Sequence, residues 1–442
     1  MQAFRNRSFI VFGLMVFIKP GCISGMPALS AVDRAFNIAR ILLVIYTAAS
    51  IAKGVRKVRT GRVFGVFLLI TASCTWEVAA TFLNGRTVSD WGALFNGAGI
   101  LIFAYAALKT DMDTFIEGAA RLFWWYVVIN TVTVAAFPRG MYATARYSRN
   151  YFLSYRTSWF AVYLLGAMFS LLLYEKNRRK KDARMLASLL ACEAVSMGIV
   201  WTATGLFSLA AAGILLLIWK KEGSRGAHIE TIILLEAAVF FGVVIKRLQK
   251  HMSFLLVDIM NKDTTLTFRT RIWDSAIACI KKHAATGVGR LDAGTMREIL
   301  GYGASHPHCR YLYVAMCSGA AGLLLYILTI YAAFRRNPYG KASPAQSRIL
   351  AAAAVAMLTA GQVESFSATG TYLYLLFMTA AELNSCRTRA PASLHRDAGL
   401  AAYNKRHRSR ASGGDICIWK KQEETNRETP AQSNVTGNFT NS

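Results

Sequence analysis

Long apolar runs recur along the chain up to about residue 384, and each is roughly 18–22 residues long, the length that an α-helix needs to cross the hydrocarbon core of a bilayer. The 442 residues are 54% apolar and only 17% charged, which argues against a soluble multidomain enzyme. The sequence therefore predicts an all-α integral membrane protein with about twelve transmembrane helices. The candidate spans are residues 8–25, 37–53, 63–83, 90–108, 119–137, 158–174, 185–203, 205–219, 229–246, 311–333, 349–363 and 370–384.

The start of the chain has the pattern of a signal peptide, with Arg5 and Arg7 ahead of an apolar run. Lys19 and Pro20 interrupt this run without a small-residue cleavage site, which predicts a retained first helix with a cytoplasmic N-terminus. Lysines and arginines cluster in the loops after the second, sixth, eighth and tenth spans, so these loops and the C-terminus are also expected in the cytoplasm. Topology thus explains many of the basic residues behind the net charge of +27, which in a soluble protein would suggest nucleic acid.

The spans divide the chain into four parts. Residues 1–246 hold nine helices and a basic outer loop at 138–157, and residues 247–310 form one large extracytoplasmic loop. Residues 311–384 hold the last three helices. Residues 385–442 form a basic, polar tail that is expected to be disordered in the cytoplasm.

The large outer loop contains apolar residues at helical spacing from Ile272 to Ile280. This spacing predicts an amphipathic helix over residues 271–283, which either lies along the membrane surface or packs on the spans below it. Both outer loops are also basic, against the usual bias toward the cytoplasmic side. Their arginines are either solvated or bind an anionic ligand.

Other patterns in the sequence indicate little chemistry. The eight cysteines form no CxxC pair and show no metal-ligand spacing, so neither a disulfide framework nor a zinc site is expected. Asp111 and Asp113 mimic the DxD motif of many glycosyltransferases, but the pattern is short and no nucleotide-binding motif accompanies it. No metal or other cofactor is therefore expected.

A titratable imidazole, that of His308, stands where the large outer loop returns to an apolar span, and it begins the most informative motif. His308-Cys309 is followed by nine residues and then by Gly319-Ala-Ala-Gly322. Upstream, the chain reads Thr265-Leu-Thr-Phe-Arg269-Thr-Arg271-Ile-Trp273 and then Thr286-Gly287-Val288-Gly289. This order of motifs resembles that of the O-antigen ligase and capsular polysaccharide polymerase superfamily, which reads TLTGRTxxW, GxG and His-[Asn/Ser/Gln]-x9-Gly-x-x-[Gly/Thr/Tyr].

The resemblance implies roles for two of these residues: His308 as the base that deprotonates an acceptor hydroxyl, and Arg269 as a ligand of the lipid diphosphate. An imidazole that titrates near about 6.5 suits the first role, and a planar guanidinium suits the second. His306 competes for the base role, although Pro307 is expected to turn the two rings apart. Arg271 competes for the diphosphate, although in a helix its side chain diverges from that of Arg269.

Two further elements are similar to those of capsular repeat-unit polymerases. Residues 149–161 are similar in spacing to R-x-S-F-G-F-x-H-P-N-x-x-A, with Arg149 at the arginine position and Arg156 as a further candidate for the diphosphate. Residues 361–365 resemble G-L-T-E-S and place Glu364 near the outer end of a span, where a carboxylate needs a partner or water. We expect Glu364 to support the site.

The sequence departs from the family patterns at several positions. Cys309 replaces Asn, Ser or Gln, Phe268 replaces a glycine, Leu153 replaces another, and residues 156–158 replace His-Pro-Asn. A divergent polymerase for an unusual glycan and an inactive copy are both open interpretations. A purely structural role for His308, as a helix cap or a ligand of a lipid headgroup, is the alternative to the base role.

The resemblance implies a GT-C-like membrane fold and a glycosyltransferase that needs no metal. Its expected reaction joins undecaprenyl-diphosphate-linked repeat units into capsular polysaccharide, exopolysaccharide or O-antigen, at the outer face of the bacterial cytoplasmic membrane. The expected partners are the lipid-linked glycan, membrane lipid, a flippase and a chain-length regulator, with no nucleic acid. One alternative is a ligase that transfers a finished glycan to a lipid or protein; another is a transporter of the lipid-linked unit.

Overall fold

The computed structural model describes residues 2–53, 61–144, 147–221, 228–248, 268–335, 340–364 and 369–385. These residues form helices and no strand, with only isolated bridges among Tyr142, Asn150 and Tyr155. The helices are α1 (Arg7–Phe17), α2 (Gly21–Gly25), α3 (Ser30–Lys53), α5 (Arg62–Leu83), α6 (Trp91–Ala136), α7 (Phe160–Asn177), α8 (Lys180–Ile199), α9 (Ala203–Lys221), α10 (Ile229–Val239), α11 (Arg269–Lys282), α12 (Ala293–Leu300), α13 (Arg310–Phe334), α14 (Pro344–Val363) and α15 (Thr369–Leu383). A π-helical turn, η3 (Phe240–Ile245), continues α10.

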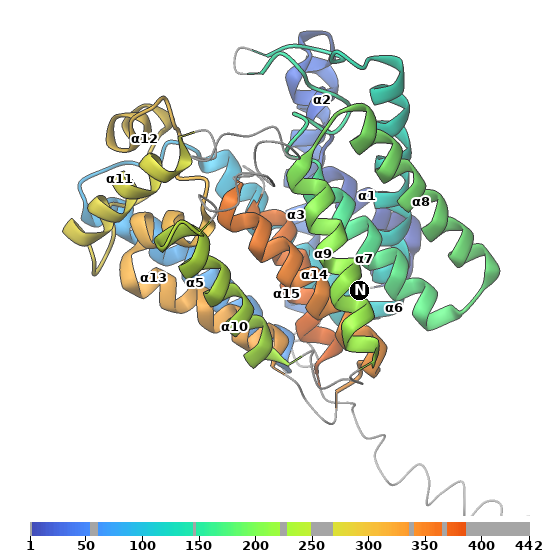
Figure 1. Cartoon of the computed structure of the whole chain (residues 1–442). Coiled ribbons are helices and arrows are strands. Elements are labelled where there is room, and N and C mark those ends of the chain that lie inside the picture. Colours follow the sequence, from blue (N-terminus) through green and yellow to red (C-terminus); the bar gives the residue numbers. More distant parts are fainter. Residues whose placement is uncertain are drawn as a thin grey trace, which may run out of the picture. The chain divides into compact units, whose positions relative to one another are not determined.

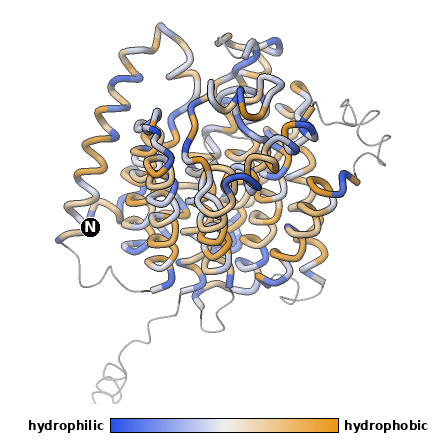
Figure 2. Tube along the Cα trace, turned by 90° about the vertical axis from the view of Figure 1, so that its left-hand side faces the viewer, coloured by the Kyte–Doolittle hydropathy of each residue, from blue (hydrophilic) through white to orange (hydrophobic). Residues whose placement is uncertain are grey.

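Six helices within these residues are long and apolar enough to cross a membrane. Hydrophobic residues cover most of the length of the helices in Figure 2. The predicted all-α membrane protein is therefore confirmed, whereas this count does not confirm about twelve spans. Helix α6 illustrates the difference, because its 46 residues are interrupted by extended backbone at Asp111, between the predicted spans 90–108 and 119–137.

Helix α6 is the centre of the larger hydrophobic core. It packs against α1, α3, α7, α8 and α15. Phe123 of α6 stacks on Phe169 of α7, with ring centroids 5.8 Å apart, and Phe103 of α6 lies 5.7 Å from Phe17 of α1. Asp90 begins α6 as its N-cap by accepting a hydrogen bond from the backbone N–H of Ala93. Aromatic packing and capping thus hold the helix that forms part of the wall of the site.

Helices α11 and α12 lie together, and α11 packs on α13 (Figure 1). Ile272, Trp273 and Ala276 are buried in a second hydrophobic core that also includes Met316 of α13. The predicted amphipathic helix over 271–283 is confirmed as α11, and its apolar face packs on neighbouring helices. Residues 249–267 of the predicted large loop, and nearly all of the predicted tail, lie outside the described residues.

The two glycine motifs meet in space. Gly319 interrupts α13 with a φ of 61°, and a Cβ there would lie 2.2 Å from the carbonyl oxygen of Ala285. The N–H of Gly289 donates to the carbonyl of Cys317 at 2.9 Å, and the N–H of Ala320 donates to Ala284 at 2.8 Å. Only glycine fits so close an approach with this backbone. The motif around Gly287 and the motif after His308 therefore form one packed unit.

Candidate active site

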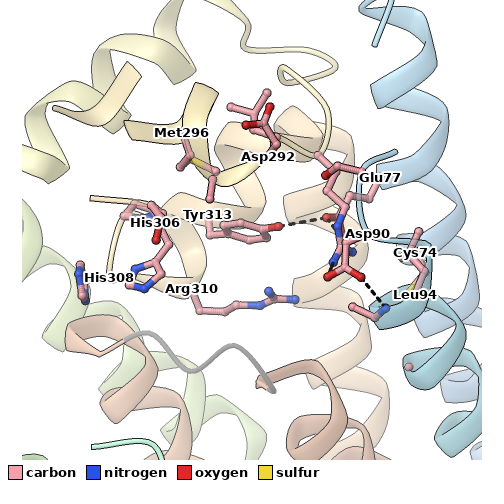
Figure 3. Close-up of a pocket in the computed structure, with 18 of the residues that line it drawn as sticks. Cys74, Glu77, Asp90, Leu94, Asp292, Met296, His306, His308, Arg310 and Tyr313 are labelled. Atoms are coloured by element: carbon pink, nitrogen blue, oxygen red, sulfur yellow. Dashed lines mark hydrogen bonds and ion pairs between the residues drawn. The ribbon is translucent and has the colours of Figure 1, made fainter. Parts of the chain in front are cut away.

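A cavity of about 390 Å³ lies among α5, the start of α6, the segment before α13, the end of α14 and α15. Figure 3 shows His306 and His308 at one end, Glu77 and Asp90 at the other, and Arg310 between them. The charged and titratable side chains that line it and enter the chemistry below are Glu77, Arg290, His306, His308, Arg310 and Glu364.

His308 lies between buried neighbours and faces a carboxylate. Its Nδ1 is 3.8 Å from Oε1 of Glu364, and its backbone is left-handed, with a φ of 50°. The rings of His306 and His308 lie 4.2 Å apart at 75°, so the expectation that Pro307 turns them apart is wrong. Glu364 and His306 thus both lie beside the predicted base.

Glu364 also pairs with Arg269, at the start of α11. Nη2 of Arg269 donates to Oε2 of Glu364 at 2.9 Å, and its Nη1 donates to the carbonyl of Val363. Only 10% of the Arg269 side chain and 7% of the Glu364 side chain are exposed, so this is a buried ion pair. Arg269 does not line the cavity, and it reaches the site through Glu364.

The other three predicted arginines lie away from the cavity lining. The guanidinium of Arg271 lies 5.6 Å from the ring centroid of Tyr302, so it diverges from Arg269 as the helix predicts. Arg149 is exposed and Arg156 is half-buried in the segment between α6 and α7. The cavity therefore brings together three of the seven predicted site residues, namely His306, His308 and Glu364.

Sequence reasoning missed two arginines that do line the cavity. Arg290 lies 3.9 Å from Glu77 and 4.0 Å from Asp90, and its backbone N–H donates to Oγ1 of Thr81 at 2.8 Å. The guanidinium of Arg310 lies 5.3 Å from the ring centroid of Tyr313, and no described carboxylate comes within 4.0 Å of it. Their positions in the sequence could have indicated them, because Arg290 directly follows the GxG motif and Arg310 directly follows the His-Cys pair.

Glu77 of α5 lines the cavity at the end opposite His308. Its Oε1 accepts a hydrogen bond from the hydroxyl of Tyr313 at 3.3 Å. A carboxylate in that position can accept hydrogen bonds from the hydroxyls of a sugar.

Cys309 is a neutral, buried side chain. It is 2% exposed, and burial raises the pKa of its thiol to about 12, while backbone N–H groups of Leu312 and Tyr311 act in the opposite direction. A protonated thiol is a weak nucleophile, and the Cys309 side chain packs in the second hydrophobic core. It fills the position where the related motif has the polar residue Asn, Ser or Gln.

The cavity brings together an imidazole, its carboxylate neighbour and two guanidinium groups. An imidazole held by a carboxylate can take a proton through its other nitrogen. Two guanidinium groups can bind the oxygens of a diphosphate. Within the described ranges, no three His, Cys, Asp or Glu side chains are grouped in a way that could hold a metal ion.

Comparison with known proteins agrees with the motifs. Residues 150–327 match a family described as O-Antigen ligase. No curated protein matches the chain. The matched segment runs from the stretch before α7 into α13 and includes His308, Arg290 and Arg310. It supports the assignment of this membrane protein to the O-antigen ligase and polymerase superfamily.

Proposed function

We propose that the protein is a polymerase that joins undecaprenyl-diphosphate-linked repeat units into capsular polysaccharide, exopolysaccharide or O-antigen. The reaction takes place at the outer face of the bacterial cytoplasmic membrane. One observation carries this proposal: a single cavity is lined by a histidine with a carboxylate behind it and by two arginines. The similarity of residues 149–161 and 361–365 to capsular polymerase motifs favours the polymerase branch.

His308 acts as the general base. Nδ1 faces Glu364, which orients the ring and stabilises the imidazolium that forms, and Nε2 accepts the proton of an acceptor sugar hydroxyl. The acceptor oxygen attacks the anomeric carbon of the growing chain, and the bond from that carbon to the lipid diphosphate breaks. A single displacement of this kind inverts the configuration at the anomeric carbon.

Arg290 and Arg310 stabilise the departing lipid diphosphate. Both line the cavity with His308, and Arg310 extends between its two ends (Figure 3). Each charge-assisted hydrogen bond to a phosphate oxygen contributes about 1.5–3 kcal/mol, and more of this is realised as negative charge develops on the leaving group. Arg269 acts through Glu364. Arg149 and Arg156 were predicted to bind the diphosphate, and since they lie away from the cavity lining we assign them instead to a part of the lipid-linked substrate that extends beyond the cavity.

A ligase is the second candidate, because the matched family is described as O-Antigen ligase. It would use the same base and cations but transfer a finished glycan to another lipid or to a protein. The products distinguish the two reactions. Purified protein incubated with a lipid-linked repeat unit gives a ladder of chain lengths if it is a polymerase, and a single transfer to an added acceptor if it is a ligase.

A further inference from the structure

A buried carboxylate outside the cavity joins the helix ends that carry the candidate site. Glu236 of α10 is 6% exposed and lies in contact with α14. Its Oε2 accepts a hydrogen bond from Nε2 of Gln362 at 2.6 Å, and its Oε1 accepts one from the hydroxyl of Thr359 at 2.8 Å. Oε2 also accepts a hydrogen bond from the hydroxyl of Tyr311 at 3.2 Å. One carboxylate thus has partners on α13 and α14.

These partners are close in sequence to the reacting groups. Gln362 stands two residues before Glu364, and Nε2 of Gln362 also donates to the backbone carbonyl of Glu236 at 3.0 Å. Tyr311 stands three residues after His308, on the first turn of α13. Glu236 therefore links the segment that carries His308, through Tyr311, to the segment that carries Glu364, through Gln362.

A second connection, from α11, acts on the same end of α14. Arg269 donates to the carbonyl of Val363, the residue between Gln362 and Glu364. Gln362 is fully buried, so water cannot replace Glu236 as the partner of its amide. Loss of the bond to Glu236 would leave a buried donor unsatisfied, which destabilises the fold. The end of α14 is thus bonded to both α10 and α11.

We propose that Glu236 is a positioning residue, which sets the separation of His308 and Glu364 through Gln362 and Tyr311. This inference rests on the proposed function, because it assigns Glu236 to the support of that same site. A displacement of about 1 Å at a reacting group can lower a rate by up to 10²-fold, so a residue that never touches substrate can control turnover.

The chain offers a matched control. Glu193 of α8 is 1% exposed, and no described residue donates a hydrogen bond to either of its carboxylate oxygens. It is a carboxylate of the same type and burial that does not line the cavity. Replacing Glu193 therefore reproduces the removal of a buried carboxylate without touching α13 or the end of α14.

The experiment compares Glu236→Leu, Glu236→Gln and Glu193→Leu in the full-length protein. The first readout is steady-state turnover with a lipid-linked repeat unit. Glu236→Leu lowers kcat by about tenfold or more while KM stays within about threefold, because substrate contacts are intact and the geometry of the base is not. Glu236→Gln keeps an acceptor oxygen and retains most of the parent kcat. Glu193→Leu leaves kcat and KM unchanged.

The second readout does not depend on activity. Hydrogen exchange followed by mass spectrometry measures the amides at the end of α14, where the N–H of Glu364 donates to Ala360 at 2.9 Å. Glu236→Leu speeds exchange of the amides of residues 360–364 by about tenfold, because the end of α14 can then open without first breaking bonds to Glu236. Glu193→Leu leaves the exchange of these amides unchanged.

The two readouts fail in different ways. Unchanged exchange and unchanged kcat in Glu236→Leu overturn the positioning role, as does an equal loss in Glu193→Leu. A parent protein that transfers no glycan overturns the proposed function instead, and the exchange result then still decides whether Glu236 holds the end of α14.

Discussion

Glu364 divides its two carboxylate oxygens between two partners: Oε2 accepts a hydrogen bond from Arg269 at 2.9 Å, and Oε1 lies 3.8 Å from Nδ1 of His308. The three residues come from α11, the segment before α13 and the end of α14. Their meeting explains why an arginine, a histidine and a carboxylate occur in separate motifs far apart in the sequence.

Glu364→Gln is expected to lower both stability and turnover. The change leaves the buried cation of Arg269 without its charged partner, which costs about 3 kcal/mol, and removes the group that orients His308. Thermal unfolding in detergent and turnover of the lipid-linked substrate measure the two effects. The double change Arg269→Leu with Glu364→Leu removes the uncompensated charge, so it recovers stability without recovering activity; recovery of both would contradict the orienting role.

Arg310→Met is expected to reduce kcat/KM for the lipid-diphosphate substrate by about 10–10²-fold, because the leaving group loses a charge-assisted partner. The same reduction is expected for Arg290→Met. Arg271→Met is the comparison, since Arg271 lies over Tyr302 and outside the cavity lining. If Arg271→Met lost as much as Arg310→Met, the diphosphate would have to bind along α11.

Cys309→Ser is expected to retain activity, because the thiol is buried and neutral. Burial disfavours the thiolate, so the pKa of Cys309 is raised to about 12 and alkylation stays slow from pH 7 to 9, increasing only as the pH approaches that value. Peptide mapping after treatment with a maleimide checks this. Fast labelling of Cys309 in the folded protein at pH 7, or loss of turnover in Cys309→Ser, would show that the thiol is exposed or used.

Gly319→Ala is expected to prevent stable folding. The new Cβ would meet the carbonyl oxygen of Ala285 at 2.2 Å, and the residue would keep a φ of 61°, which alanine adopts only with strain. The yield of monodisperse protein after detergent extraction measures the effect. Gly213→Ala in α9 is the matched control, since no described atom beyond the adjacent residues and the backbone of its own helix lies within 4 Å of the position that a Cβ would take there. A normal yield for Gly319→Ala would contradict the close packing of the two glycine motifs.

Several features could be predicted because their cause is local. The apolar spacing around Trp273 predicts α11, and the histidine motif predicts that His308 lies at a site. The distribution of the cations could not be predicted, because it depends on contacts between distant segments. Arg290 is placed by the approach of its segment to Thr81 on α5, and Arg269 bonds to the cavity residue Glu364 without lining the cavity itself.

The ring contact between His306 and His308 was also beyond sequence reasoning. The restriction that Pro307 places on its own backbone does not determine the φ of 50° at His308, which brings the rings together. That left-handed backbone arises where His308 stands between buried Pro307 and buried Cys309. The orientation of the His308 ring therefore depends on tertiary packing, which the local sequence does not reveal.

The most direct test of the base role is the initial rate of chain formation by His308→Ala, measured on purified protein with a lipid-linked repeat unit. We predict a loss of about 10³-fold relative to the parent, less than a tenfold loss for His306→Ala, and no change for His283→Ala, whose side chain is exposed at the end of α11. A parental rate for His308→Ala would contradict the assignment of His308 as the base.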